Sequence, residues 1–171
     1  MSVVAQSTTM SDPNVNLERW IFASVDNFFE TTLNPLLPLT IEGRAFENLD
    51  LPARAELRIT GPTLFNQIGD YWKAEVNIDI LVQVVADDVN YHTIWNKIGI
   101  ARESMQPCIP VYRYGNGGAD DETFVANLKR YSPTGRAGEE IRVTPFGRVE
   151  PEVNLYQATV DAFYKMEFKN Q

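Results

Sequence analysis

Apolar and polar residues alternate strictly along two long stretches of the chain. In the first, every second residue from Trp72 to Val84 is apolar, and polar residues such as Lys73 and Asp79 occupy most positions between them. The second stretch, Tyr156–Phe168, has the same pattern. A period of two is typical of a strand that buries one face. The sequence therefore predicts two long strands, each with one apolar and one polar face.

Two other stretches have apolar residues three and four positions apart, which is the spacing of a helix with one buried stripe. The first extends from Leu17 to Leu33 and ends at Asn34-Pro35, and the second extends from Tyr91 to Met105 and ends before Pro107. Proline cannot continue a helix, so both ends are defined. Three tryptophans, Trp20, Trp72 and Trp95, lie on the apolar stripes of these elements, which favours core packing for all three.

Shorter elements fill the remainder of the chain. Further strands are predicted at Leu39–Arg44, Ala53–Thr60, Ile109–Tyr114 and Ile141–Thr144. Gly61-Pro62 indicates a turn that ends the second of these strands. Phe124–Tyr131 fits both an alternating and a helical pattern, so its structure stays open. Gly115–Glu122 and Pro133–Gly138 have the composition of loops.

The order of elements is helix, strands, helix, strands, without an internal repeat. Two helices are too few to cover both faces of such a sheet. We therefore expect an α+β fold in which two main helices pack on one face of a mostly antiparallel, or else mixed, β-sheet. Residues 1–15 lack apolar periodicity and are expected to form a flexible N-terminal segment, and residues 16–171 a single domain. The polar sheet face must then meet water or another subunit.

Composition narrows the possible functions. The net charge is −8, which disfavours binding to nucleic-acid phosphates. One cysteine excludes an internal disulfide, and with one histidine it cannot complete a zinc site. The longest apolar stretch, Ile78–Ala86, is too short to span a bilayer, so no membrane association is expected. The opening residues also lack a signal-peptide pattern.

The candidates for catalysis all have simpler interpretations. His92 and Cys108 are interpreted as a surface histidine and a small packed cysteine, because no cation adjoins the thiol in sequence. The glycines of the Gly115–Glu122 loop precede acidic residues, which would repel phosphate. Asp87-Asp88 and Asp120-Asp121-Glu122 lack the spacing of a calcium loop and are interpreted as a helix cap and a solvated loop. We therefore expect no catalytic, metal or cofactor site.

Several segments resemble the tail-terminator and neck (head–tail joining) proteins of tailed bacteriophages. These are LERWIFASVDNFF, ARAELRITGP, DYWKAEVNIDILVQV and VYRYG, in that order along the chain. The resemblance implies a small α+β virion subunit that forms a ring, commonly a hexamer. Such a ring caps the tail tube, docks onto head-completion proteins and leaves a channel through which DNA passes without specific binding. It implies no catalytic residue and no cofactor.

Other functions remain open on the sequence. One is another head–tail connector or head-completion protein. A second is a hydrolase that uses the carboxylates of Asp79 or Asp161, and a third is a module that binds a small ligand. If the chain forms a ring, one expected interface pairs the cations on the polar sheet face with acids of the next subunit. Those cations are Arg54, Arg58 and Lys73, and the acids are Asp120, Asp121 and Glu122.

Overall fold

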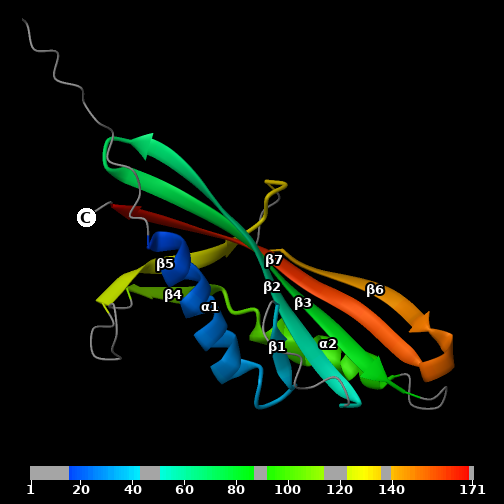
Figure 1. Ribbon diagram of the computed structural model, residues 1–171. Helices are drawn as coiled ribbons and strands as arrows, with labels where there is room; N and C mark the ends of the chain where they lie inside the picture. The colour runs from blue at the N-terminus through cyan, green and yellow to red at the C-terminus, as the bar shows by residue number, and fades with distance from the viewer. Residues whose placement is uncertain (1–15, 43–50, 87–91, 114–122, 136–139, 170–171) are drawn as a thin grey trace, which may run out of the picture.

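The computed structural model describes residues 16–42, 51–86, 92–113, 123–135 and 140–169. Within these ranges the chain forms two helices and seven strands, with one short 3-10 turn, η1 (Pro151–Val153) (Figure 1). The helices are α1 (Leu17–Thr32) and α2 (Thr93–Ser104). The strands are β1 (Leu39–Ile41), β2 (Ala53–Ile68), β3 (Tyr71–Val85), β4 (Cys108–Arg113), β5 (Thr123–Tyr131), β6 (Ile141–Glu150) and β7 (Leu155–Lys169).

All seven strands belong to one sheet, in which six follow the order β1-β2-β3-β7-β5-β4 and β6 pairs with β7 outside this order. Two strands pair with the edge of β7 that faces away from β3. β6 pairs with Leu155–Ala162 of β7, and β5 pairs with Phe163–Lys165 of β7. β1 runs parallel to β2, whereas the other pairs are antiparallel. The fold is therefore α+β with a mixed sheet, which is the second of the two arrangements expected. Alternation in a sequence carries no information on strand direction, so the parallel pair was not predictable from it.

One hydrophobic core lies against a single face of the sheet. Val76 and Ile78 of β3 point into it, together with Tyr164 of β7, which pairs with Val76. Both helices contribute to the same core, α1 through Phe29 and α2 through Ile98. The prediction that two helices pack on one face is confirmed. Burying this apolar face is the main source of folding free energy, since such burial stabilises by about 25 cal/mol per Å².

Two polar contacts fix the helices against the sheet. The hydroxyl of Ser24 on α1 accepts a hydrogen bond of 3.0 Å from the backbone N–H of Tyr112, so α1 covers the edge of β4. The hydroxyl of Tyr164 donates to the carbonyl oxygen of Gln106 at 2.8 Å, directly after α2. A buried polar group is costly unless it is hydrogen-bonded, so these contacts select one position for each helix.

The prediction of a turn at Gly61-Pro62 is wrong, because β2 continues through it to Ile68. The pairing with β3 shifts register between Thr60 and Thr63, and Gly61 has a φ of +108°, a conformation that glycine tolerates. Along this part of β2 the described chain has no strand on the far side. Proline lacks an N–H donor and is tolerated where no neighbouring strand needs one.

β6 is longer than the predicted Ile141–Thr144, and continues to Glu150 through Pro145 and Gly147. Most side chains of β6 are exposed, so its sequence lacks the alternation of apolar residues from which its full length could be predicted. It is held by pairing with β7, and its register shifts twice, next to Pro145 and next to Glu150. Pairing to one long neighbour is sufficient to hold an edge strand whose own pattern is weak. The ambiguous stretch from Phe124 is also a strand, β5.

Candidate functional site

A row of four charges crosses the polar face of the sheet. The register places Arg58 of β2 opposite Asp79 of β3, Asp79 opposite Asp161 of β7, and Asp161 opposite Arg142 of β6. The sequence alone did not show that Asp79 and Asp161 are neighbours, because they lie on strands far apart in the chain. The structure thus brings together the two carboxylates that a hydrolase would use.

The two carboxylates have different environments. Asp161 is 7% exposed and accepts two hydrogen bonds from the Arg142 guanidinium, 3.0 Å from Nε and 2.5 Å from Nη2. The guanidinium also lies over the ring of Phe163, with its carbon 5.1 Å from the ring centroid. Both hydrogen bonds end on the same carboxylate oxygen, Oδ2, and charge-assisted hydrogen bonds of this kind are stronger than neutral ones. Asp161 therefore serves as the charge partner of Arg142.

Asp79 is less well compensated. Its Oδ1 atom is buried and has no hydrogen-bond partner among the described residues. Burial raises the pKa of Asp79 above its ordinary value of 3.8, and the negative charge of Asp161 raises it further. Arg58, which faces Asp79, donates its Nε–H to Glu56 at 3.0 Å instead, and this hydrogen bond raises the pKa of Arg58. Like charges placed directly opposite each other on a sheet are destabilising.

We expect Asp79→Asn to stabilise the protein at neutral pH. The folded chain holds the Asp79 proton more tightly than the unfolded chain, so this group favours folding only below about pH 4 and the benefit is lost as the pH rises through the folded pKa. The variant should therefore gain about 0.5 to 1 kcal/mol in free energy of unfolding at pH 7, and the gain should vanish towards pH 3.5. Urea unfolding at several pH values measures this difference.

The exposed Asp70, in the turn between β2 and β3, provides the matched control. Asp70→Asn removes the same charge from a solvated position, so its stability should be nearly unchanged at every pH. A stability difference between Asp79→Asn and the unmodified chain that does not vary with pH would contradict the assigned environment.

The three cations expected at a subunit interface lie on the polar face, and each contacts a neighbour within its own chain. Arg54 donates to the side-chain oxygen of Gln83 at 2.7 Å, and Arg58 to Glu56. Lys73 forms an ion pair with Glu75 and lowers the pKa of that carboxyl. Their expected partners, Asp120, Asp121 and Glu122, lie outside the described residues, as do Asp87 and Asp88 and residues 1–15. The proposed pairing stays a prediction.

The structure also shows whether the histidine, the cysteine and two of the tryptophans singled out in the sequence are exposed or buried. His92 is exposed, as expected, at the start of α2. Cys108 is also exposed, so its interpretation as a packed cysteine is wrong. Trp95 is 52% exposed rather than buried, because the buried face of α2 is formed by Ile94, Ile98 and Ala101 and is too narrow to include it. Trp20 is buried and its indole lies against the guanidinium of Arg113.

Within the described ranges, no group of three or more His, Cys, Asp or Glu side chains is arranged to hold a metal ion. Neither helix is both long and apolar enough to cross a membrane. The glycines of the predicted Gly115–Glu122 loop lie outside the described residues.

The sheet divides at one end of the molecule, which the sequence did not indicate. β5 and β7 pair only through Lys129–Tyr131 and Phe163–Lys165, and beyond Lys165 the described strands separate (Figure 1). We call the segments Thr123–Leu128 and Met166–Lys169, which do not pair with each other, together with the adjoining Arg113, Lys129 and Lys165, the fork. Two cavities of about 420 and 460 Å³ open between them. The fork thus presents backbone edges and open space at the same place.

The fork is basic although the chain as a whole is acidic. Among the described residues, four cations and one carboxylate line the two cavities, namely Arg113, Lys129, Lys165, Lys169 and Glu167. Phe124 borders both cavities and is 52% exposed. An exposed aromatic ring surrounded by cations is typical of a surface that binds a partner with acidic and apolar groups.

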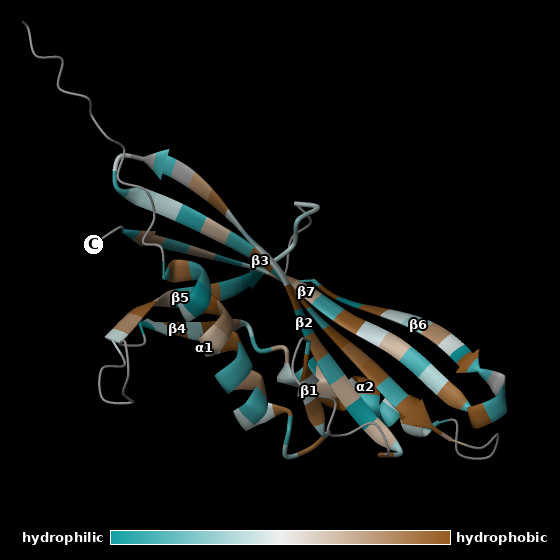
Figure 2. Cartoon of the chain, viewed as in Figure 1, coloured by the Kyte–Doolittle hydropathy of each residue, from teal (hydrophilic) through white to brown (hydrophobic). Residues whose placement is uncertain are grey.

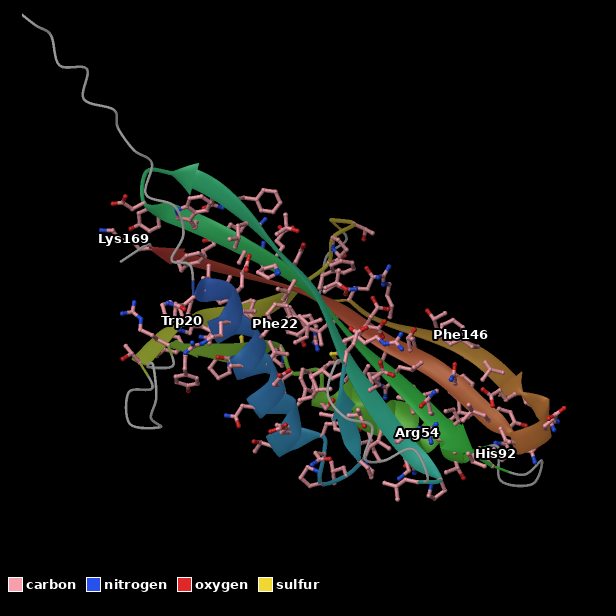
Figure 3. The ribbon with its side chains drawn as sticks, viewed as in Figure 1. Trp20, Phe22, Arg54, His92, Phe146 and Lys169 are labelled. Atoms are coloured by element: carbon pink, nitrogen blue, oxygen red, sulfur yellow. The ribbon has the colours of Figure 1, made fainter. Side chains whose placement is uncertain are left out.

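The opposite end of the molecule has the reverse character. There β6 turns into β7 through η1, and the side chains of Val149, Glu150, Glu152 and Val153 are exposed. We call these four residues the tip. Figure 2 shows apolar positions at the end of β6, and Figure 3 shows Phe146 projecting from the same strand, far from Lys169 at the fork. Several exposed apolar side chains at the end of an edge strand indicate a contact surface.

No protein-family model matches the chain, and no curated protein matches it in sequence.

Proposed function

We propose that this chain is a structural virion protein of a tailed bacteriophage, a tail-terminator or neck subunit. Copies of it form a ring, commonly six in the proteins it resembles, that caps the tail tube and joins the tail to head-completion proteins. DNA passes through the channel of the ring without specific binding. The protein is made in the host cytoplasm, resides in the virion, needs no cofactor and turns over no substrate.

One observation carries the proposal beyond the sequence resemblance: two unlike surfaces, the fork and the tip, lie at opposite ends of one long sheet. Identical subunits that join through two different patches make a heterologous interface, which gives a ring when the rotation closes. A subunit with a single self-complementary patch would instead form a two-fold dimer. The position of the two surfaces supports a ring.

The electrostatics support passage of DNA rather than binding. With a net charge of −8 per subunit, a ring carries a strongly negative overall field. Phosphates are repelled by such a field, so DNA moves through it more readily than past a basic wall. The cations of the fork are few and lie in one place, where a neighbouring subunit would cover them.

A hydrolase is the second candidate, and the position of Asp79 opposite Asp161 on neighbouring strands favours it. Two neighbouring carboxylates in different environments can act as a general acid and a base. However, Asp161 is engaged by Arg142 in two hydrogen bonds, and neither of the two cavities at the fork borders the pair. The arrangement is accounted for by cross-strand charge pairing, so we favour the structural function. Another connector or head-completion role would use the same ring geometry.

Deletion of the gene from the parent phage tests the proposal. Electron microscopy of the lysate should show DNA-filled heads beside unattached tails, some of abnormal length, and infectious titre should fall by several orders of magnitude. A plasmid copy of the gene should restore joined particles, which controls for effects on neighbouring genes. Normal, joined and infectious particles after deletion would reject the function.

A further inference from the structure

We propose that the tip of one copy docks into the fork of the next copy, and that this contact is the repeating interface of the ring. The inference rests on the proposed function and assigns the residues that make its assembly contact. The fork supplies Phe124, Lys129 and Lys169, and the tip supplies Val149, Glu150 and Val153.

The two surfaces cannot meet within one chain. β7 begins next to the tip at Leu155 and ends at the fork with Lys169, a span of 15 residues. An extended strand rises about 3.3 Å per residue, so the two surfaces lie about 45 Å apart. Figure 3 shows Phe146 of β6 and Lys169 of β7 well apart along the sheet. Any contact between the tip and the fork is therefore a contact between two copies.

Charge and apolar character are complementary across the contact. The tip has the exposed carboxylates of Glu150 and Glu152, and its nearest cation, Arg148, is hydrogen-bonded to Asn154 at 2.5 Å. The fork has four cations around one carboxylate. Val149 and Val153 of the tip offer aliphatic groups to the exposed ring of Phe124. Opposite potentials of this kind favour one register and disfavour contact between two tips or two forks.

The edges of the strands also allow this contact. In the described chain, Thr123–Leu128 of β5 has no partner on the side facing β7, and β6 has none on its outer side. Such edges readily pair with a strand of another molecule, and an obligate neighbour protects them from aggregation. Each copy would cover one edge of the copy before it and one of the copy after it.

The test uses the full-length chain and two charge-reversed variants. In the first, Glu150→Lys and Glu152→Lys make the tip basic, and in the second, Lys129→Glu and Lys169→Glu make the fork acidic. Sedimentation velocity up to about 1 mM protein should show association of the unmodified chain, and each variant should associate at least about tenfold more weakly. Because all four side chains are exposed, both variants should keep the circular dichroism spectrum and melting temperature of the unmodified chain.

A mixture of the two variants gives the decisive result. The basic tip of the first variant matches the acidic fork of the second, and the remaining tip and fork are unaltered and match each other. Association should therefore return in the equimolar mixture, with the two variants alternating. An alternating ring closes only with an even number of subunits, so a hexamer should reappear, whereas an odd-numbered ring should give open chains.

Controls separate this inference from the proposed function. Glu30→Lys with Glu103→Lys reverses two exposed charges on α1 and α2 that line neither fork cavity and do not belong to the tip, and should leave association unchanged. No association of the unmodified chain, unchanged association of both variants, or no recovery in the mixture would each overturn the contact. If the deletion phage still lost its head–tail joining in that case, the proposed function would stand and a different interface would form the ring.

Discussion

Replacing Val76 with aspartate is expected to lower the free energy of unfolding by about 4 kcal/mol or more, a large part of the roughly 5 to 15 kcal/mol that is typical of a folded domain. Val76 is 2% exposed, lies at the centre of β3 and pairs with the buried Tyr164 of β7. A carboxylate at this position would have no partner in an apolar core. Urea unfolding followed by circular dichroism would measure the loss, and a variant that is too unstable to fold would show it as well.

The neighbouring Glu75→Ala is the matched control. Glu75 points to the polar face, where it forms an ion pair with Lys73 that is about one quarter exposed. Exposed pairs contribute little, so this change should cost about 0.5 kcal/mol. Similar losses for the two variants would show that the core side of β3 is assigned incorrectly.

Arg142→Met is expected to cost about 2 to 3 kcal/mol. Removing one member of a buried ion pair leaves the other charge without compensation, which costs about 3 to 5 kcal/mol when both are fully buried. Here Asp161 is buried but the Arg142 side chain is about half exposed, so the cost is smaller. The uncompensated Asp161 would also face Asp79 directly. Thermal and urea unfolding measure the effect.

A second substitution distinguishes this electrostatic effect from a loss of packing. Asp161→Asn added to Arg142→Met should recover at least half of the lost stability, because it removes the isolated charge. Arg148→Met is the matched control on the same strand, and it should cost less than about 0.5 kcal/mol because Arg148 is exposed. If Asp161→Asn gave no recovery, the Arg142 contact with the Phe163 ring would account for the loss instead.

The sequence by itself determined the elements that have a strong hydrophobic period. The helix from Leu17 and the long strands at Trp72–Val84 and Tyr156–Phe168 each appear in the structure at nearly the predicted positions. The reason is that each of these elements buries one continuous face in the core, so its buried positions are apolar and its exposed positions are mostly polar. The polar face of β3 follows from the same pattern.

The tertiary structure decided the features that depend on a neighbouring strand. β2 continues through Gly61-Pro62 because it pairs with β3, and β6 continues to Glu150 because it pairs with β7. Backbone pairing with a neighbouring strand does not require a hydrophobic period in the strand itself. The pairing of Asp79 with Asp161 and the separation of β5 from β7 arise from the register and path of strands far apart in the chain. Local patterns determine which face of an element is buried, whereas long-range pairing determines which polar groups and open edges come together.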